Sequence, residues 1–155
     1  MTKICLEPIG HVVSNFENPE ELIFACEKGL QTTTNSKIIL DKKYAQGTKG
    51  LEEFSHIFVI YFLDQATKLE LTTHPGPPSE KTLPKVGVFA SRSQYRPNHI
   101  ALRLVKLIKI EDNTLHVQGL DAINESQVLD IKPYIAGFDR PKEFKIAPWY
   151  DWLDK

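Results

Sequence analysis

Cysteine is scarce in this chain of 155 residues, which holds only Cys5 and Cys26. Neither belongs to a CxxC or Cys/His cluster, which excludes a disulfide-stapled scaffold and predicts two free, mostly buried thiols in a reducing compartment. No carboxylate or histidine pair stands at the spacing of a metal site, so we expect no bound metal.

Long apolar runs are missing as well. The N-terminus has no extended apolar stretch, which argues against a signal peptide. The longest apolar run, residues 57–63, is too short to span a bilayer. We therefore expect a cytoplasmic protein without membrane contact.

The common nucleotide-binding loops are absent, because the chain holds neither GxGxxG nor GxxxxGK[ST]. It also has no internal repeat. What remains is an ordinary globular composition, 41% hydrophobic and 25% charged. We expect one domain covering residues 1–155, a length that needs no disulfide or metal to hold a core.

Charge is unevenly distributed along the chain, although the net charge is only −1. Residues 84–110 carry 6 basic and no acidic side chains, whereas the flanking segments are mildly acidic. Such a segment favours an anionic ligand, but a basic strand neutralised by acidic neighbours fits the charge pattern equally well.

Hydrophobic periodicity predicts many short strands and few helices. A helix is expected to begin at Asn18-Pro19, with Leu22, Ile23, Cys26 and Leu30 as its apolar stripe. The expected strands cover residues 4–13 (an edge strand), 38–40, 54–63, 86–91, 100–110, 115–119 and 128–134. Because helical crossovers rarely separate them, we predict a mainly β fold, a single antiparallel sheet closed into a barrel with one or two short helices.

Three details of this pattern carry specific expectations. Residues 54–63 indicate a strand buried on both faces. Residues 100–110 fit a strand with a bulge at Leu104-Val105, although the three-residue spacing of Arg103, Lys106 and Lys109 also fits a basic helix. Residues 72–84 hold four prolines and predict a long surface loop.

The first segment with chemical potential is GVFASRSQYRPNHI, residues 87–100. A strand runs into a loop with two arginines four residues apart, and arginine offers a rigid fork of donors for carboxylate or phosphate. Proline and asparagine would stiffen that loop. The alternative is an ordinary arginine-rich loop paired with acids elsewhere in the fold.

Two further segments stand out. In VLDIKPY, residues 128–134, Asp130 and Lys132 share one strand face opposite Leu129 and Ile131. They form either a structural ion pair or, if that face lines a barrel, a buried functional pair. In GLEEFSH, residues 50–56, His56 is more typical of a satisfied core histidine than of an acid/base group.

Together with GLD at residues 119–121 and PIGHVVSNF at residues 8–16, these motifs resemble the TsaA-like (TrmO) family in the family's order. The resemblance covers most of residues 7–139. It implies a single-sheet β-barrel, a homodimer, S-adenosylmethionine as cofactor, and methylation of N6 of a threonylcarbamoyl-adenosine in the anticodon loop of tRNA.

The resemblance also assigns residues. The cofactor would be bound by Phe89, Ala90, Arg92, Arg96, Asn98, His99, Ile100 and Asp130, and the catalytic group would be Asp130, Lys132 and Tyr134. In our interpretation of the basic segment, RNA would contact Arg92, Tyr95, Arg96, Arg103 and Lys106, with Tyr95 stacking on an unpaired base.

Methyl transfer needs aligned donor and acceptor more than strong acid/base groups. We expect Asp130 to orient the amine or take its proton. The same barrel acting on a small molecule or another acceptor, and a non-catalytic S-adenosylmethionine-binding module, are the alternatives. The family's Pro-Arg-Gln or Pro-x-Gln motif after Phe16 is replaced here by the helix-like residues 18–29.

Overall fold

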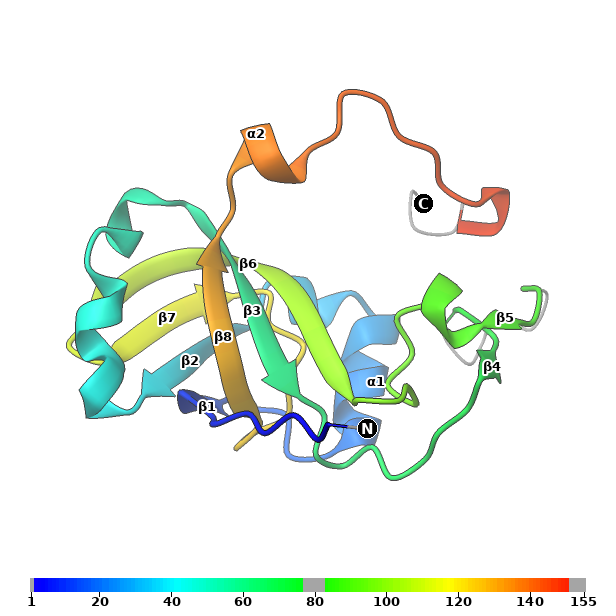
Figure 1. The fold of residues 1–155 in the computed structure, drawn as a ribbon, viewed down its shortest axis with the longest axis horizontal. Coiled ribbons are helices and arrows are strands. Elements are labelled where there is room, and N and C mark those ends of the chain that lie inside the picture. Colours follow the sequence, from blue (N-terminus) through cyan, green and yellow to red (C-terminus); the bar gives the residue numbers. More distant parts are fainter. Residues whose placement is uncertain (1, 77–82, 151–155) are drawn as a thin grey trace.

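The computed structural model describes residues 2–76 and 83–150. Six strands form a closed antiparallel barrel in the order β1-β2-β7-β6-β3-β8 (Figure 1). They are Gly10–Val13 (β1), Asn35–Leu40 (β2), His56–Phe62 (β3), Ile100–Glu111 (β6), Thr114–Gln118 (β7) and Gln127–Pro133 (β8). This confirms the predicted barrel, and because the barrel is closed, β1 is paired on both sides instead of being an edge strand.

The remaining elements are short. A two-stranded ribbon joins Thr72–Thr73 (β4) and Val86–Gly87 (β5), and the α-helices are Pro19–Glu27 (α1) and Ala136–Asp139 (α2). Four 3₁₀ turns complete the set: Leu30–Thr32 (η1), Lys42–Thr48 (η2), Leu51–Glu53 (η3) and Val88–Ala90 (η4). After α2 the chain leaves the barrel and returns towards η4 (Figure 1).

The core lies inside the barrel and follows the two-residue alternation of its strands. The fully buried side chains include Val12, Ile38, Ile57, Val59, Val105, Leu115, Val117 and Val128. Burying such aliphatic side chains is the main favourable term in folding, at about 1.5–3 kcal/mol each. The β-branched side chains that predicted strands thus also supply the core.

Helix α1 begins where its sequence predicts. The Asn18 side chain accepts a hydrogen bond from the Glu21 amide at 2.9 Å, and Pro19 occupies the first turn. The predicted apolar stripe is wrong, because Ala25 is the buried residue of α1, while Ile23, Cys26 and Leu30 are exposed. The two cysteines are free, as expected, but both are exposed and not buried.

Three other predictions need correction. Strand β3 is buried on one face only, since Ile57, Val59 and Tyr61 point inward and Phe62 is exposed. The strand expected at residues 86–91 ends at Gly87, where η4 begins. Residues 100–110 do form a bulged strand, but the register shift lies between Leu107 and Lys109 and not at Leu104-Val105.

The predicted surface loop of residues 72–84 begins in the β4–β5 ribbon, and its residues 77–82 lie outside the described part of the chain.

Close packing between β1 and β2 depends on Gly10. A Cβ atom at Gly10 would lie 2.8 Å from the Leu40 Cα atom and collide with the Ile39 carbonyl oxygen. Both obstacles are backbone, so no side chain can move aside to relieve the contact. Glycine here lets β1 approach β2 closely enough to close the barrel.

We expect Gly10→Ala to lower the free energy of unfolding by about 1–3 kcal/mol, because the added methyl forces the two strands apart. Gly47→Ala is the matched control, since a Cβ at Gly47 meets nothing within 4 Å. Thermal unfolding followed by circular dichroism measures both variants, and equal melting temperatures would contradict the prediction.

Candidate functional site

The position of Asp130 is set by an irregularity in β8. Tyr61 of β3 pairs with Val128, but the preceding Ile60 pairs with Asp130, so Leu129 is an extra residue in β8. Val128 points into the core with Tyr61, whereas Asp130 shares the outer face with Ile60. The extra residue turns the Asp130 carboxylate out of the barrel.

Asp130 and Lys132 form an ion pair on this outer face. The Lys132 Nζ atom lies 2.9 Å from Asp130 Oδ2, and the side chains are 64% and 47% exposed. Asp130 Oδ1 also accepts a hydrogen bond from the Ile131 amide at 2.9 Å. An ion pair this exposed adds only about 0–1 kcal/mol to stability. The sequence correctly placed the two charges on one face, and that face is accessible to a ligand.

Tyr134 follows directly after β8 and is tied to β3. Its amide donates to the His56 carbonyl oxygen at 3.0 Å, and its ring packs edge-on against Phe58 at a centroid distance of 6.0 Å. His56 itself is half-buried, with Nδ1 2.8 Å from Ser55 Oγ. Tyr134 therefore lies beside Lys132 on the outer face, while His56 is engaged by its neighbour.

The loop between η4 and β6 is held by its own hydrogen bonds. Ser91 Oγ accepts from the Ser93 amide at 3.2 Å, and Ser93 Oγ accepts from the Tyr95 amide at 3.2 Å. The Arg96 guanidinium donates to the carbonyl oxygens of Ser91 and Ser93 at 3.3 and 3.2 Å. Arg96 is thus a structural centre of the loop.

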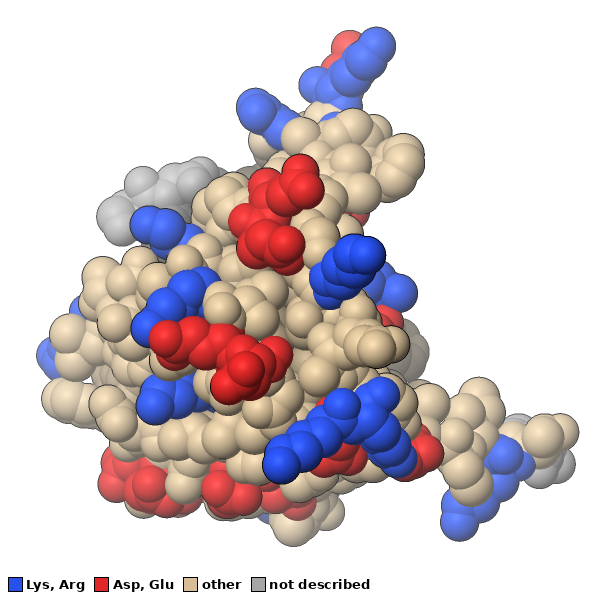
Figure 2. Space-filling view, turned by 90° about the vertical axis from the view of Figure 1, so that its left-hand side faces the viewer, with Lys and Arg blue, Asp and Glu red and all other residues tan. Residues whose placement is uncertain are grey.

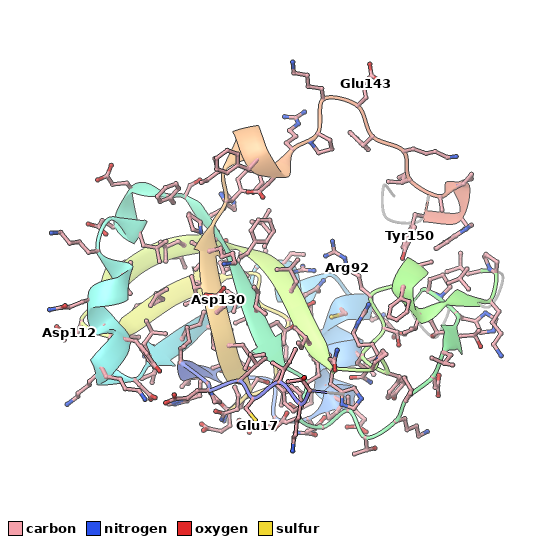
Figure 3. The ribbon with its side chains drawn as sticks, in the orientation of Figure 1. Glu17, Arg92, Asp112, Asp130, Glu143 and Tyr150 are labelled. Carbon is pink, nitrogen blue, oxygen red and sulfur yellow. The ribbon has the colours of Figure 1, made fainter. Side chains whose placement is uncertain are left out.

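Arg92 differs from Arg96. Its side chain is exposed, and within residues 2–76 and 83–150 its guanidinium has no hydrogen-bond or ion-pair partner. Figure 3 shows Arg92 on this loop and Asp130 on β8, and in the sheet β3 and β6 lie between the two. A rigid loop that presents an unpaired guanidinium suits a carboxylate or phosphate ligand.

The loop ends in a strained turn fixed to β3. His99 has a φ of 45°, its carbonyl oxygen accepts from the Leu63 amide at 2.8 Å, and its ring lies 6.3 Å from that of Phe62. Asn98 beside it is exposed, and no other residue of the described ranges bonds its carboxamide. Ile100 then opens β6, paired with Phe62.

Phe89 and Ala90, in η4, lie at the other end of this loop and are exposed. The Tyr150 hydroxyl donates to the Ala90 carbonyl oxygen at 3.2 Å, so the segment that follows α2 returns to η4. Seven of the eight predicted cofactor residues therefore lie on one continuous stretch, residues 89–100, bounded by the C-terminal segment at one end and by β3 at the other, whereas Asp130 lies apart from them on β8.

Pairing registers connect this loop to the Asp130 face. Leu102 of β6 pairs with Ile60 of β3, and Ile60 pairs with Asp130 of β8. Neighbouring strands lie about 4.8 Å apart, so Leu102 and Asp130 are separated by about 10 Å across the outer face.

A groove opens at the same end of the barrel. Its volume is about 440 Å³, and one wall is the N-terminal segment with Ile4, Leu6 and Pro8. The opposite wall is formed by Phe62, Asn98, Ile100, Gln127 and Leu129. Sequence reasoning missed the groove, because its walls come from the ends of separate strands and no local motif marks them.

The Arg103 side chain is bonded to other residues of the protein. Its Nε donates to the Gly119 carbonyl oxygen at 3.1 Å, and one terminal nitrogen lies 3.5 Å from Asp121 Oδ2. The buried Tyr61 hydroxyl lies 2.8 and 2.9 Å from the carbonyl oxygen and Oδ1 of Asp121. Burial, and next the Asp121 carboxylate, raises the pKa of Tyr61 well above its ordinary value, so the phenol stays protonated as a donor.

The other basic residues of the 84–110 segment are divided. Lys109 pairs with Glu111 at 2.9 Å, whereas Lys106 is exposed and no acidic residue of the described ranges pairs with it. On the face shown in Figure 2, basic and acidic side chains are interspersed. Both interpretations of this segment hold in part, because acids neutralise Arg103 and Lys109 but leave Arg92 and Lys106 available.

Residues 12–140 match the family model described as the tRNA-methyltransferase O N-terminal domain. The chain belongs to this TrmO family. A solved structure, TrmO from Pseudomonas aeruginosa, superposes with a TM-score of 0.74 at 25% identity, covering 96% of this chain and 62% of that one. The family resemblance stated from the motifs is therefore confirmed, and so is the barrel.

Two of the relatives differ from each other in length. A protein of Pyrococcus abyssi named "Probable S-adenosyl-L-methionine-binding protein" is 32% identical over 98% of this chain and 77% of its own length. The tRNA (adenine(37)-N6)-methyltransferase of Mus musculus is 41% identical over 90% of this chain but only 33% of its own length. The chain thus corresponds to most of the archaeal protein and to a third of the mouse enzyme.

No three His, Cys, Asp or Glu side chains gather as metal ligands within residues 2–76 and 83–150. Across the same ranges, no helix is long and apolar enough to cross a membrane.

The two arginines of the loop should behave differently when truncated. Arg96→Ala removes donors to two loop carbonyls, and hydrogen bonds from a charged group contribute about 1.5–3 kcal/mol, so amide exchange at residues 91–96 should accelerate about tenfold or more. Arg92→Ala is the matched control and should leave these rates unchanged. Hydrogen exchange mass spectrometry reports both, and equal protection in the two variants would refute the structural role of Arg96.

Proposed function

We propose that this chain is an S-adenosylmethionine-dependent methyltransferase that acts on N6 of the threonylcarbamoyl-adenosine next to the anticodon in tRNA. The observation that carries the proposal is that Asp130 and Lys132 lie on an open barrel face of β8, while the rigid loop that presents Arg92 leads directly into β6, and both β8 and β6 are paired with β3. Membership of the TrmO family and the names of its relatives support it.

The residues present fit the cofactor. S-adenosylmethionine supplies an activated methyl group when bound. The free guanidinium of Arg92 suits its carboxylate, and Asn98 offers an unpaired carboxamide for its neutral groups. Phe89 and Ala90 before Arg92, and His99 and Ile100 after Asn98, supply the surface on either side of these two polar groups; all but the half-buried His99 are exposed.

The chain's own groups would do little chemistry beyond positioning and proton handling. Asp130 accepts a hydrogen bond from the acceptor amine, which fixes the direction of the nitrogen lone pair, and takes the proton that the amine loses. Lys132 lies 2.9 Å from Asp130 Oδ2 and holds the carboxylate in place. Tyr134, packed on Phe58, bounds the site next to Lys132. Alignment of the reacting atoms is worth about 7–11 kcal/mol.

RNA contacts would centre on the basic groups that the fold leaves available. Arg92 and Lys106 are exposed, and Tyr95 is half-buried with Lys68 Nζ 5.9 Å from its ring centroid. Phosphates attract such cations without regard to sequence. Arg96 and Arg103 already donate to carbonyl oxygens of the chain, so we assign them to shaping the RNA surface. We place the enzyme in the cytoplasm because free thiols and a tRNA substrate both fit that compartment.

The direct test is methylation of bulk tRNA, with modified nucleosides identified by mass spectrometry. We expect wild-type protein to convert threonylcarbamoyl-adenosine to its N6-methyl form. Asp130→Asn should lower kcat about 100-fold with unchanged S-adenosylmethionine affinity, because the amine loses its proton acceptor. Asp112→Asn, in the β6–β7 turn at the far end of the barrel (Figure 3), is the matched control.

Undiminished turnover by Asp130→Asn would remove that residue from catalysis. Calorimetric binding of S-adenosylmethionine without methylation of any tRNA would instead favour a non-catalytic binding module, and methylation of a metabolite alone would favour a small-molecule acceptor.

We also propose that the chain forms a homodimer through an apolar stripe on the outer face, defined by Phe58, Ile60, Leu102 and Leu104. These side chains lie on the paired strands β3 and β6, and Leu102 and Leu104 are exposed. The stripe carries no charge, which favours a protein partner over RNA. A second copy is the occupant that the family resemblance implies, and Asp130 would lie at the border of its contact.

A charge in the stripe should separate the subunits. Leu104→Glu is expected to raise the dimer dissociation constant at least 100-fold, because the carboxylate would be buried without a partner. Ile23→Glu on α1 is the matched control and should leave the dimer intact, since the Ile23 and Leu104 side chains are both 41% exposed. Light scattering coupled to size-exclusion chromatography measures the mass. A wild-type monomer, or a dimer unaffected by Leu104→Glu, would contradict the proposed interface.

A further inference from the structure

Among the residues that line the groove behind the N-terminal segment, only Asn98 and Ile100 have a role in the function proposed above. The N-terminal segment forms one wall of the groove, and it is anchored to β8 by a hydrogen bond from the Ile9 amide to the Val128 carbonyl oxygen at 2.8 Å. The residues before Ile9 pass over the start of β8 and the end of β3 (Figure 1). The groove is therefore built by the barrel and by a segment that is fixed to it at one end.

The walls of the groove select for a flat, uncharged ligand. None of its lining residues is acidic or basic, and most are aliphatic side chains, with the Phe62 ring on one side. An anionic group placed here would lose its hydration without a counter-charge. A volume of about 440 Å³ is large enough for a heterocyclic base, which carries no charge to be compensated.

Only two side chains of the groove carry polar groups, and both are carboxamides. Asn98 has no partner among residues 2–76 and 83–150, and Gln127 uses Nε2 to donate to the Glu125 carbonyl oxygen at 3.3 Å, which leaves its oxygen as an acceptor. A carboxamide presents a donor and an acceptor side by side, and this arrangement matches the amine and ring nitrogens of adenine.

The groove also lies next to the proposed proton acceptor. Leu129 lines it, and Leu129 is the extra residue of β8 that turns Asp130 outward. A base in the groove would therefore extend its exocyclic amine towards the face that carries Asp130. The Leu6 side chain on the N-terminal wall is 60% exposed, so the groove is open to solvent, as a base presented by an RNA loop requires.

We propose that this groove holds the adenine base of the methyl acceptor, between the N-terminal segment and Phe62, with Asn98 and Gln127 bonded to its polar edge. This inference rests on the proposed methyltransferase function. It assigns the segment before β1 to substrate binding and places the acceptor base next to the cofactor, with Asn98 and Ile100 at the boundary between the two.

The test uses adenosine as the probe and Leu6→Arg as the variant. Wild-type protein is first saturated with S-adenosylhomocysteine, the unreactive product, and adenosine is then titrated while the side-chain amide signals of Asn98 and Gln127 are followed by NMR. We expect saturable shifts in the wild type and at least a tenfold weaker adenosine affinity in Leu6→Arg. Leu30→Arg, at a residue 51% exposed on η1, is the matched control and should bind like the wild type.

A second readout distinguishes the occupants. Leu6→Arg should raise KM for tRNA at least tenfold, with calorimetric S-adenosylhomocysteine affinity within twofold of the wild type. If S-adenosylhomocysteine itself shifts the Gln127 amide signal and blocks adenosine, the groove binds the cofactor and the proposal is overturned. It is equally overturned if adenosine shifts neither signal. Failure of the methyltransferase function is seen separately, as wild-type protein that neither binds S-adenosylhomocysteine nor methylates tRNA.

Discussion

One extra residue in β8 determines where the chemistry of this barrel can occur. Strict alternation from Val128 would direct Asp130 into the core, among aliphatic side chains that offer a carboxylate no partner. Burying an unpaired carboxylate costs several kcal/mol, so the charged strand and the closed core are incompatible without the irregularity. The register shift at Leu129 resolves this, because it keeps Val128 inside and places Asp130 and Lys132 outside.

The rest of the site follows from that shift. Because β3 pairs with both β8 and β6, the Asp130 face and the loop before β6 belong to one rigid surface. The loop is fixed to β3 through the Leu63 amide and the His99 carbonyl oxygen. The groove uses the same displaced residue, Leu129, as part of its wall. Catalysis by alignment requires groups held in a fixed relation, and strand pairing supplies that relation here.

The sequence predicted the barrel and the segments that carry the site, because period-two alternation and ordered motifs are local signals. It predicted that Asp130 and Lys132 share a face, but it grouped Leu129 with Ile131, and the structure separates these two. Ile131 packs on the core while Leu129 lines the groove. Bulges are set by the pairing of two strands, and a single strand's sequence does not reveal where they fall. The charge of Arg103 predicted a contact with RNA. In the structure its side chain instead donates to the Gly119 carbonyl oxygen, sixteen residues further along the chain.

Closure of the barrel has a consequence for how the molecule meets other molecules. Each barrel strand is paired on both sides over part of its length, and residues 100–105 of β6 and 130–133 of β8 have a ladder partner on one side only. Another chain therefore finds only short stretches of open backbone on which to add a strand. Most contacts with the barrel are made through side chains and loops, whose identity can change without altering the ladder beneath them. The same backbone can therefore accept new partners by surface substitution while remaining protected from edge-to-edge aggregation.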